Sequence, residues 1–416
     1  MILHTLPRGW SWSILDEVAL PNKNAIVDGP FGSNLKTSDY RPKGVPVLQG
    51  KNITNSRFEW KEIRYISEEK ADELKRSQVR LGDLLMIKIG SIGYSAYLDE
   101  LNGHDFAVIP ANMAKISFDS KKVDKRYVWH WLNNPVSVRE LIARSSKTAQ
   151  PALSLTKIKT FPIPLPPLPE QVRIAAILDK AVSISYKCKQ AINLANDLLS
   201  AAFLDMFGDP VSNLKGWERQ PLKNILDRID SGWSPKCYNR DPAEGEWGVL
   251  KLGAVTTCNF LERESKALPS DQVPRPQLEV KKGDLLFTRK NTYDLVAACA
   301  LVHSTRSKLM LSDLIFRLRI KPKAKVVPAY LWALLTHSGK RKQIQGIAGG
   351  AAGSMPNISK GRLLEQLIEI PDFELQVDFS RLLTKVIDFQ SKLSSGAEEN
   401  ELLYNSLIQR AFRGEL

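Results

Sequence analysis

Residues 163–172 have the sequence IPLPPLPEQV, and residues 368–377 have the sequence IEIPDFELQV. Each stretch leads into a long segment whose apolar residues are spaced as in an amphipathic helix. A phrase that returns about 205 residues later indicates a duplicated module, in which a domain is followed by a helix. The period is too long for a solenoid, whose repeats are roughly 20–50 residues long.

Shorter pairs recur at about the same spacing. A chain that is duplicated in this way is expected to present two similar binding surfaces, related by an approximate two-fold axis. Duplex DNA is the commonest partner with two-fold character. The pairs are GW at 9–10 and 216–217, VPVLQ at 45–49 and WGVLK at 247–251, GDLL at 82–85 and 283–286, and YVW at 127–129 and YLW at 330–332.

The composition favours a polyanionic partner. The 416 residues are enough for two or three domains. Lys and Arg number 59 against 45 Asp and Glu, which gives a net charge of +14. Cations that neutralise phosphates release condensed counterions, so this excess favours nucleic acid over a merely basic surface.

The cysteines and the N-terminus indicate a cytoplasmic protein without a membrane partner. Cys188, Cys237, Cys258 and Cys299 show no CxxC spacing, which is typical of reduced thiols rather than a zinc site or disulfides. The first 18 residues lack the charged and then apolar run of a signal peptide. No apolar run reaches the roughly 20 residues that cross a bilayer.

The pattern divides the chain into four segments. A mixed α/β domain covers residues 1–165, a helix 166–208, a second α/β domain 209–370, and a C-terminal helix 371–416. Within the first domain we expect a helix over residues 127–144, with Asp124 as its N-cap and a break or kink at Pro135. Five prolines between residues 162 and 169 forbid a helix there and favour a stiff polyproline lead-in.

The segment from Glu170 to Phe207 predicts an uninterrupted helix of about 35 residues, about 50 Å long. Its apolar residues follow a seven-residue repeat, so the helix needs a partner along one side. One seam consists of Ile174, Ala181, Cys188, Ala195 and Ala202, the other of Ile177, Ile184, Ala191 and Leu198, and the stripe is widened by Leu178, Ile192 and Leu199.

The partner is expected to be the second long segment, Phe373 to Phe412. Asn400 occupies a seam position, where a buried polar group fixes register. Gly396 is expected to break or loosen this helix. The alternative is two helices that pack separately, each on its own domain. The expected stripe comprises Leu375, Phe379, Leu382, Leu383, Val386, Phe389, Leu393, Leu403 and Leu407.

With these features together, the chain resembles the specificity subunit of a type I restriction–modification system. The resemblance covers essentially the whole chain. It is carried by the domain-and-helix order, GWSWSILDEV and GWERQPLKNIL at the module entries, PLPPLPEQVRIAAILDKA at the first hinge, SMPNISKGRLLE at 354–365 and NSLIQRAFRGEL at the C-terminus. It implies an α+β fold with two target recognition domains and two antiparallel helices that form an intramolecular coiled coil, with pseudo-two-fold symmetry.

The resemblance also implies a division of labour. Each domain recognises one half of a split, asymmetric DNA target, and the helices set the gap and dock two methylation subunits. Restriction–translocase subunits complete the enzyme. This subunit would itself bind no cofactor, because S-adenosylmethionine, ATP and Mg²⁺ belong to the partner subunits.

The motifs independently argue against catalysis by this chain. The text nearest to an adenine-methylation loop, Asn133-Asn134-Pro135-Val136, lacks the second proline and the aromatic residue. No nucleotide-binding GxG or GxxxxGK[ST] phrase is present. A nuclease cluster of Asp271, Glu279 and Lys281 is disfavoured by the prolines between them. The five histidines share no metal spacing.

Residues that follow the predicted strands are the candidates for DNA contact. Arg289-Lys290-Asn291 is the best single candidate, because Arg pairs with guanine O6 and N7 and Asn with adenine N6 and N7. For each Lys or Arg, the alternative is a solvated surface charge, and the glycine-rich loop 346–354 is either a phosphate contact or a loop without a ligand. The candidates are Lys36, Lys51, Lys88, Ser91, Lys147 and Gln150 in the first domain, and Lys251, Arg289, Lys290, Asn291, Tyr293, Gly350 and Ser354 in the second.

Other classes of function remain open at this point. An autonomous methyltransferase or nuclease lacks its catalytic motifs. A non-catalytic protein scaffold leaves the positive charge unexplained. A stand-alone DNA-binding protein, such as a transcription factor, would be expected to show a compact helix-turn-helix phrase, and none is visible.

Overall fold

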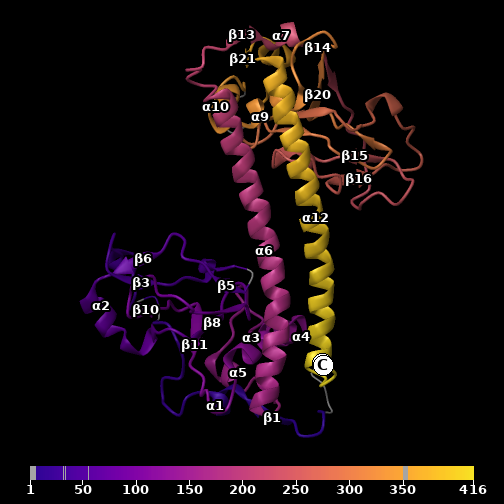
Figure 1. Cartoon of the computed structure of the whole chain (residues 1–416). Coiled ribbons are helices and arrows are strands. Elements are labelled where there is room, and N and C mark those ends of the chain that lie inside the picture. The colour runs from indigo at the N-terminus through magenta and orange to yellow at the C-terminus, as the bar shows by residue number, and fades with distance from the viewer. Residues whose placement is uncertain (1–5, 31, 33, 55, 350–354) are drawn as a thin grey trace. The chain divides into compact units, whose positions relative to one another are not determined.

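The computed structural model describes residues 6–30, 32, 34–54, 56–349 and 355–416. The chain divides into two compact units, and many of their elements are labelled in Figure 1. Unit 1 comprises residues 1–189 and 395–416, and unit 2 comprises residues 190–394. Each unit therefore combines one α/β domain with half of each long helix. The four-segment division expected from the sequence remains a prediction.

Unit 1 contains two four-stranded sheets. The antiparallel sheet has the order β2-β11-β8-β9, and the mixed sheet has the order β6-β3-β10-β7, in which β3 and β10 are parallel. The pairs β1-β12 and β4-β5 are antiparallel. The strands are β1 Ser11–Ile14, β2 Ile26–Asp28, β3 Val45–Val47, β4 Ile53–Thr54, β5 Arg57–Phe58, β6 Arg64–Ile66, β7 Gln78–Val79, β8 Leu84–Ile87, β9 Ser95–Tyr97, β10 Ala107–Val108, β11 Met113–Ile116 and β12 Pro162–Leu165.

The helices of unit 1 are short, apart from the long ones. The helix expected over residues 127–144 is divided at Pro135, which is the first residue of its second part. Asp124 caps the first part as predicted, because its carboxylate accepts from the amides of Arg126 and Tyr127. The elements are α1 Leu15–Val18, η1 Thr37–Asp39, η2 Gly50–Asn52, α2 Glu68–Glu73, η3 Lys75–Ser77, α3 Lys125–Asn133, α4 Pro135–Arg144 and α5 Leu155–Lys159.

Unit 2 repeats this architecture. Its antiparallel sheet has the order β14-β20-β17-β18, its mixed sheet the order β16-β15-β19, and β13 pairs with β21. The elements are β13 Glu218–Pro221, α7 Leu222–Ile225, β14 Leu226–Ser231, β15 Gly248–Leu250, α8 Gly253–Thr256, β16 Ser265–Ala267, η4 Pro276–Leu278, β17 Leu285–Thr288, β18 Cys299–Leu301, β19 Leu309–Met310, β20 Ile315–Ile320, α9 Pro328–Thr336, α10 Ser338–Gln345, α11 Lys360–Leu364 and β21 Leu367–Ile370.

The two halves therefore share a topology as well as sequence phrases. The parallel pair β15-β19 corresponds to β3-β10, and β13-β21 corresponds to β1-β12. In each unit, the apolar core joins one face of the antiparallel sheet to the long helices. The expectation of a duplicated α+β fold is thus confirmed.

Both long helices differ in detail from the prediction. α6 spans Leu168–Phe207 and includes Pro169, and two of the prolines before it, Pro162 and Pro164, lie in strand β12 rather than in a free polyproline segment. Proline is tolerated in the first helical turn, where its missing N–H has no helical partner. α12 spans Phe373–Ala411 and is not broken at Gly396. Gln390 and Asn400, on either side of this glycine, both bond to α6, which outweighs a glycine cost of about 1 kcal/mol.

The seam on α6 corrects the sequence assignment. Ile174, Ala181 and Ala195 are buried as predicted, but Ile184 and Leu198 of the other predicted seam are about half exposed. In the structure, the residues of the second seam lie four positions after those of the first seam, whereas the sequence assignment placed them three positions after. A helix with 3.6 residues per turn allows both spacings, so the sequence alone could not decide between them. That second seam comprises Leu178, Ser185, Ile192 and Leu199. On α12, Phe389 and Leu403 are likewise half exposed.

The two helices pack antiparallel in each unit. In unit 2, the rings of Phe203 and Phe207 both contact Phe379, and the Gln390 amide donates to Asn196 Oδ1 at 2.9 Å. In unit 1, the buried amide of Asn400 donates to the backbone oxygen of Ala181 and to Ser185 Oγ, both at 2.7 Å. The predicted register role of Asn400 thus has a geometric basis, since a shifted register would strand a buried amide.

A buried glutamine ties the first domain to α6. Gln171 lies in the first turn of the helix and is 1% exposed. Its Oε1 accepts from the amide of Asp124 at 2.9 Å, and its Nε2 donates to the oxygens of Pro166 at 2.9 Å and Lys122 at 3.3 Å. One side chain thus joins the start of α6, the residue that follows β12 and the segment before α3.

Gln376 makes the same three bonds in unit 2. It is fully buried at the start of α12, accepts from the amide of Val327 at 2.9 Å, and donates to the oxygens of Pro371 at 2.8 Å and Lys325 at 3.1 Å. We call Gln171 and Gln376 the glutamine clamps. They are the Gln of the two phrases PEQV and ELQV, so the repeat preserves an interaction and not only a pattern.

A second tie differs between the units. In unit 1, the ring nitrogens of buried His130 lie 3.0 Å from Asp179 Oδ1 on α6 and 3.1 Å from the Tyr404 hydroxyl on α12. Burial lowers the pKa of His130, although the Asp179 contact opposes this shift. In unit 2, a buried ion pair lies within the domain itself, where the Lys340 ammonium of α10 is 2.8 Å from Glu369 of β21.

Among the described helices, none is long and apolar enough to cross a membrane.

Replacing either glutamine clamp is expected to destabilise its unit. Gln171→Ala or Gln376→Ala leaves one buried amide and two carbonyls without their partner, so the free energy of unfolding should fall by about 2–4 kcal/mol. Urea denaturation followed by tryptophan fluorescence would measure the loss. Gln409→Ala, at an exposed position of α12, is the control and should change stability by less than about 0.5 kcal/mol. Equal effects of the three substitutions would contradict the clamp.

Candidate nucleic-acid interface

The GDLL motif builds the strand that carries the strongest candidates. Gly82 and Gly283 have φ of +87° and +89°, a conformation that favours glycine. The carboxylates of Asp83 and Asp284 each accept from the backbone amide three residues earlier, at 2.8 and 2.9 Å. The turns thus start β8 and β17, which end immediately before the predicted contact residues.

In unit 1, the end of β8 is joined to the loop that follows α4. The amide of Leu153 donates to the oxygen of Lys88 at 2.8 Å, Ile89 bridges Ala152, and the amide of Ser146 closes the loop on the oxygen of Ala152 at 2.9 Å. The loop 146–152, with Lys147 and Gln150 exposed on it, therefore lies beside the strand end.

In unit 2, the same contacts join β17 to the glycine-rich loop. The amide of Ile358 donates to the oxygen of Arg289 at 2.8 Å, and Lys290 bridges Asn357. Asn357 and Gly349 exchange both backbone bonds, at 2.9 and 2.8 Å. We call this arrangement, a strand end bonded to a closed loop, the stem. Among the residues that the structure describes, the stem of unit 2 therefore has the same backbone contacts as the stem of unit 1.

The first-domain candidates fall into groups. Lys51 and Ser91 are exposed and line one cavity of about 280 Å³ beside Gly50 and Asn112. The Lys51 ammonium lies 2.7 Å from Glu62, and this bond lowers the pKa of the Glu62 carboxyl.

Lys88 and Lys36 lie apart from that cavity group. The Lys88 ammonium is held 2.6 Å from Asp28 and is only 11% exposed, so it is poorly placed for DNA. Lys36 is exposed at the start of η1, and the structure shows no contact between it and the other candidates among the described residues.

The second-domain candidates are also placed unequally. Tyr293 is 61% exposed, whereas Asn291 is 6% exposed, with its amide 3.5 Å from Thr256 Oγ1, which disfavours base contact. Lys251 lies 4.0 Å from Asp241. Arg289 and Lys290 are half-buried at the stem. Gly350 and Ser354 lie outside the described residues.

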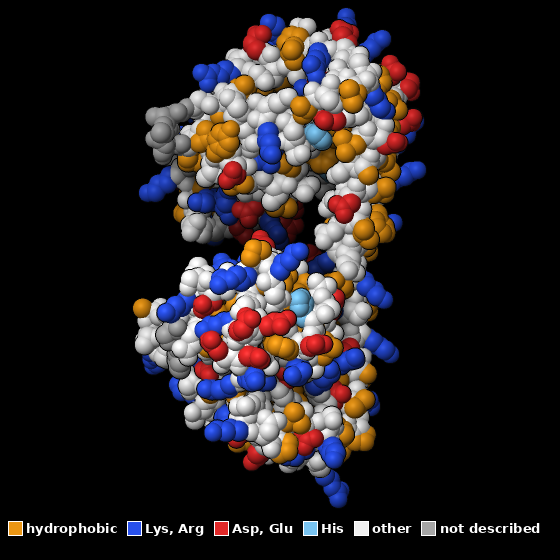
Figure 2. Space-filling view, turned by 90° about the vertical axis from the view of Figure 1, so that its left-hand side faces the viewer, with side chains coloured by type: hydrophobic (Ala, Val, Ile, Leu, Met, Phe, Trp, Pro, Cys, Tyr) orange, Lys and Arg blue, Asp and Glu red, His pale blue; other side chains and the backbone are white. Residues whose placement is uncertain are grey.

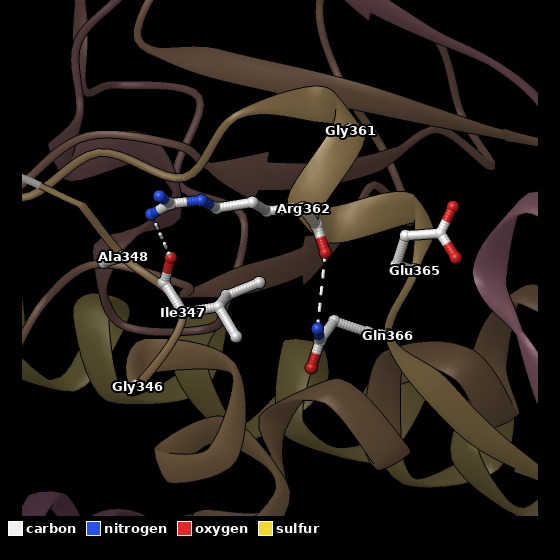
Figure 3. Close-up of a pocket in the computed structure, with 7 residues that line it drawn as sticks. All are labelled: Gly346, Ile347, Ala348, Gly361, Arg362, Glu365 and Gln366. Carbon is white, nitrogen blue, oxygen red and sulfur yellow. Dashed lines mark hydrogen bonds between the residues drawn. The ribbon is translucent and has the colours of Figure 1, made fainter.

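Arg362 supports the base of the glycine-rich loop. Figure 3 shows its guanidinium bonded to the oxygen of Ile347, at 3.0 Å, on one side of a cavity of about 510 Å³. Gly349 leaves room for this side chain, because a Cβ there would lie 2.6 Å from Arg362 Nη1. Glu365 points away from the loop and pairs with Lys223 at 2.9 Å.

Two glycines that the sequence reasoning missed shape the loops after β2 and β14. A Cβ on Gly29 would lie 2.2 Å from the backbone oxygen of Ile109, and one on Gly232 would lie 2.3 Å from the oxygens of Leu311 and Ser312. Both positions therefore demand glycine. The available signal was their common spacing in the repeat, DGP at 28–30 and SGW at 231–233.

The surface is basic without a single block of charge. Figure 2 shows Lys and Arg side chains mixed with Asp and Glu on the visible face of each unit. Glu279, which belongs to the nuclease cluster disfavoured on sequence grounds, has a structural partner: its carboxylate accepts from the amide of Lys308 at 2.6 Å. Within the described ranges, no group of three or more His, Cys, Asp or Glu is arranged to hold a metal ion.

Comparisons with known proteins show which family these features resemble. The profile described as "Type I restriction modification DNA specificity domain" matches residues 31–194. Residues 31–194 are therefore similar to a type I specificity domain. The resemblance inferred from the sequence motifs is confirmed.

The curated relatives are specificity subunits. The EcoEI type I restriction enzyme specificity subunit of Escherichia coli is 33% identical over 204 residues, which cover 47% of this chain and 34% of that protein. The EcoBI specificity subunit of Escherichia coli is 27% identical over 207 residues, 48% of this chain and 42% of that protein. The alignments thus take in less than half the length of these two relatives.

Solved structures share the fold over the full length. The type I S subunit from M. genitalium has a TM-score of 0.59 and 12% identity, and the match covers 99% of this chain and 98% of that one. A chain from a type I restriction–modification complex, solved to explain its assembly and conformational transition, has a TM-score of 0.50 and 18% identity, with 100% of both chains covered. Together with the two long helices, these matches confirm the predicted fold class.

Gly232 is expected to control the geometry of the second domain. In Gly232→Ala, the new methyl group clashes with the two carbonyls, so stability should fall by about 1–3 kcal/mol or more. Gly361→Ala is the matched control, because a Cβ there meets open space on α11 and should stabilise by up to about 1 kcal/mol. Thermal unfolding of both variants measures the difference, and a tolerated Gly232→Ala would refute the steric argument.

Proposed function

We propose that this chain is the sequence-specific DNA-recognition subunit of a type I restriction–modification enzyme. The observation that carries the proposal is the stem, which occurs in both halves and joins a strand end to a loop. It places exposed Lys147 and Gln150 on the loop of unit 1 and half-buried Arg289 at the strand end of unit 2. The matched specificity domain and the net charge of +14 support the same function. Each domain would recognise one half of a split target in double-stranded DNA.

The two half-sites should differ in sequence. At the strand end, Lys88 of unit 1 is largely buried against Asp28 and withheld from DNA, whereas unit 2 presents Arg289 bonded to the side chain of Asn357. On the loops, unit 1 carries Lys147 and Gln150, whereas the corresponding loop of unit 2 has a glycine-rich sequence. Different donors and acceptors select different bases, so an asymmetric target follows.

The long helices would serve the other two roles of the subunit. Their antiparallel seam sets the gap between the half-sites, and their outer faces dock two methylation subunits. Apolar side chains on these faces support docking: Leu194 on α6 is 67% exposed, and Leu402 on α12 is 73% exposed. Restriction–translocase subunits would join the same complex.

Catalysis would belong to the partner subunits. These subunits would hold S-adenosylmethionine, ATP and Mg²⁺, and this chain would contribute recognition alone, in the cytoplasm where cellular DNA lies. A non-catalytic scaffold or a stand-alone DNA-binding protein is the alternative. Neither accounts for the duplicated stems together with the apolar outer faces of the helices.

Methylation-aware sequencing tests the proposal directly. Cells that express this chain with the methylation subunit encoded beside it should carry a split, asymmetric adenine-methylated motif. Cells with the methylation subunit alone should lack that motif. Unchanged methylation in the presence of an expressed, folded and otherwise competent methylation subunit would reject the proposed function in favour of the scaffold.

Lengthening the helices should change the gap but not the bases. Duplication of residues 185–191 in α6 and 392–398 in α12 preserves the seven-residue repeat and adds about 10 Å. At about 3.4 Å per base pair, the gap should widen by about three base pairs. The same sequencing assay measures both properties, and altered half-site bases at a constant gap would contradict the spacer role.

A further inference from the structure

Arg289 is held in one orientation by two neighbours. Its Nε donates to the side-chain oxygen of Asn357 at 3.1 Å, and its guanidinium carbon lies 5.2 Å from the ring centroid of Phe316. Phe316 is 1% exposed and belongs to β20, so the ring cannot move aside. An Arg that is bonded at Nε and packed on an aromatic face loses much of its rotational freedom.

The two terminal nitrogens of this guanidinium can still donate hydrogen bonds to a ligand. Among the described residues, no acceptor bonds to Nη1 or Nη2 of Arg289, and the residue is half-buried rather than enclosed. These nitrogens are the donors with which Arg grips a planar acceptor pair, such as O6 and N7 of guanine.

Asn357 is itself fixed, which makes it a suitable orienting group. Its backbone exchanges both hydrogen bonds with Gly349, and the next residue donates to the oxygen of Arg289 at 2.8 Å. The orienting oxygen and the guanidinium thus project from the two sides of one stem. A shift of the loop would move the acceptor away from Arg289, so loop position and guanidinium position are coupled.

The first half of the chain provides a natural comparison. Ala152 bridges Ile89 there, as Asn357 bridges Lys290 in unit 2, and it has no side chain that could orient a neighbour. Lys88, at the position of Arg289, is held by Asp28 instead. Alanine at the bridge position is therefore compatible with a closed stem, while the orienting bond is specific to unit 2.

We infer that Asn357 is a positioning residue, which orients Arg289 to bind the O6 and N7 atoms of one guanine in the second half-site. This inference rests on the proposed function and deepens it, because it assigns one base and the pair of residues that selects it. Neither Asn357 nor its bond to Arg289 was expected from the sequence. The bond orders a flexible side chain before DNA binds, so less conformational entropy is lost on binding. A preordered guanidinium favours one base over the others, and not only attraction to the phosphates.

The test uses the complex of the full chain with its methylation subunit. Once sequencing has defined the motif, binding is measured for duplexes in which each base pair of the target is changed in turn. Arg289→Ala should lose discrimination at one G·C pair by about 5- to 150-fold. Asn357→Ala should lose discrimination at the same pair by about 2- to 12-fold, as expected for one hydrogen bond.

Two comparisons separate positioning from general damage. Asn357→Ala added to Arg289→Ala should have no further effect at that pair, because the bond it removes is already absent. Lys290→Ala, next to Arg289, should weaken binding to all duplexes alike, as loss of a phosphate contact does. A closed stem is expected in Asn357→Ala, since unit 1 already carries alanine there.

The outcomes are distinct from those of the proposed function. If Asn357→Ala weakens binding to all duplexes equally, or relaxes a pair that Arg289→Ala leaves unchanged, the positioning role is wrong. If Arg289→Ala relaxes no pair while the wild-type complex still recognises a split motif, the inference falls and the proposed function stands. Absence of any wild-type motif would remove both.

Discussion

The glutamine clamps are the constraint on which the rest of the structure depends. Each one satisfies a backbone amide and two carbonyls at the point where a domain meets its helix, and each is nearly or fully buried. Without them, polar backbone groups would be left unpaired in an apolar region. These groups lie in the residue that follows β12 or β21 and in the segment before α3 or α9. The stem, in turn, is placed by the domain that the clamp holds.

A second constraint runs along the helix seam. Alanines and other small residues on α6 let the larger side chains of α12 approach closely, and apolar contact of this kind is tolerant of sliding. Asn400 and Gln390 remove that tolerance, because their amides have partners only in the observed antiparallel register. The seam therefore combines apolar burial, which stabilises the helix pair, with two polar contacts, which select a single register.

The duplication, the fold class and the long helices were predictable because they depend on repeated phrases and on periodicity. The second seam of α6 was not, since spacings of three and four residues both fit a helix and only the partner selects one. Pro169 and Gly396 were given too much weight, because local propensity is outweighed by the first-turn position and by packing, respectively. The helix break at Pro135 was predictable, because proline at the first helical position follows directly from its missing amide proton.

Site residues were harder to predict than fold. The motif order located the strand end correctly, but the partners of individual side chains depend on contacts between distant segments. The Lys88 ammonium bonds to Asp28, which is 60 residues earlier in the chain, and the Asn291 amide lies against Thr256, which is 35 residues earlier. Asn357 was missed for the same reason, because its role exists only through its bond to Arg289. No pattern in the local sequence distinguishes it from Ala152, which takes the same place in the first half.

The stem also bears on how such a chain changes during evolution. Its hydrogen bonds join backbone to backbone, so Lys or Arg at the strand end and Ala or Asn at the bridge leave the frame intact. In the proposed function, substitutions at these positions would therefore alter which bases are preferred while the backbone frame of the stem stays intact. Under the same proposal, a newly acquired preference would be inherited together with an unchanged docking surface, so the methylating partner would modify the new sequence and host DNA would gain protection at the same step.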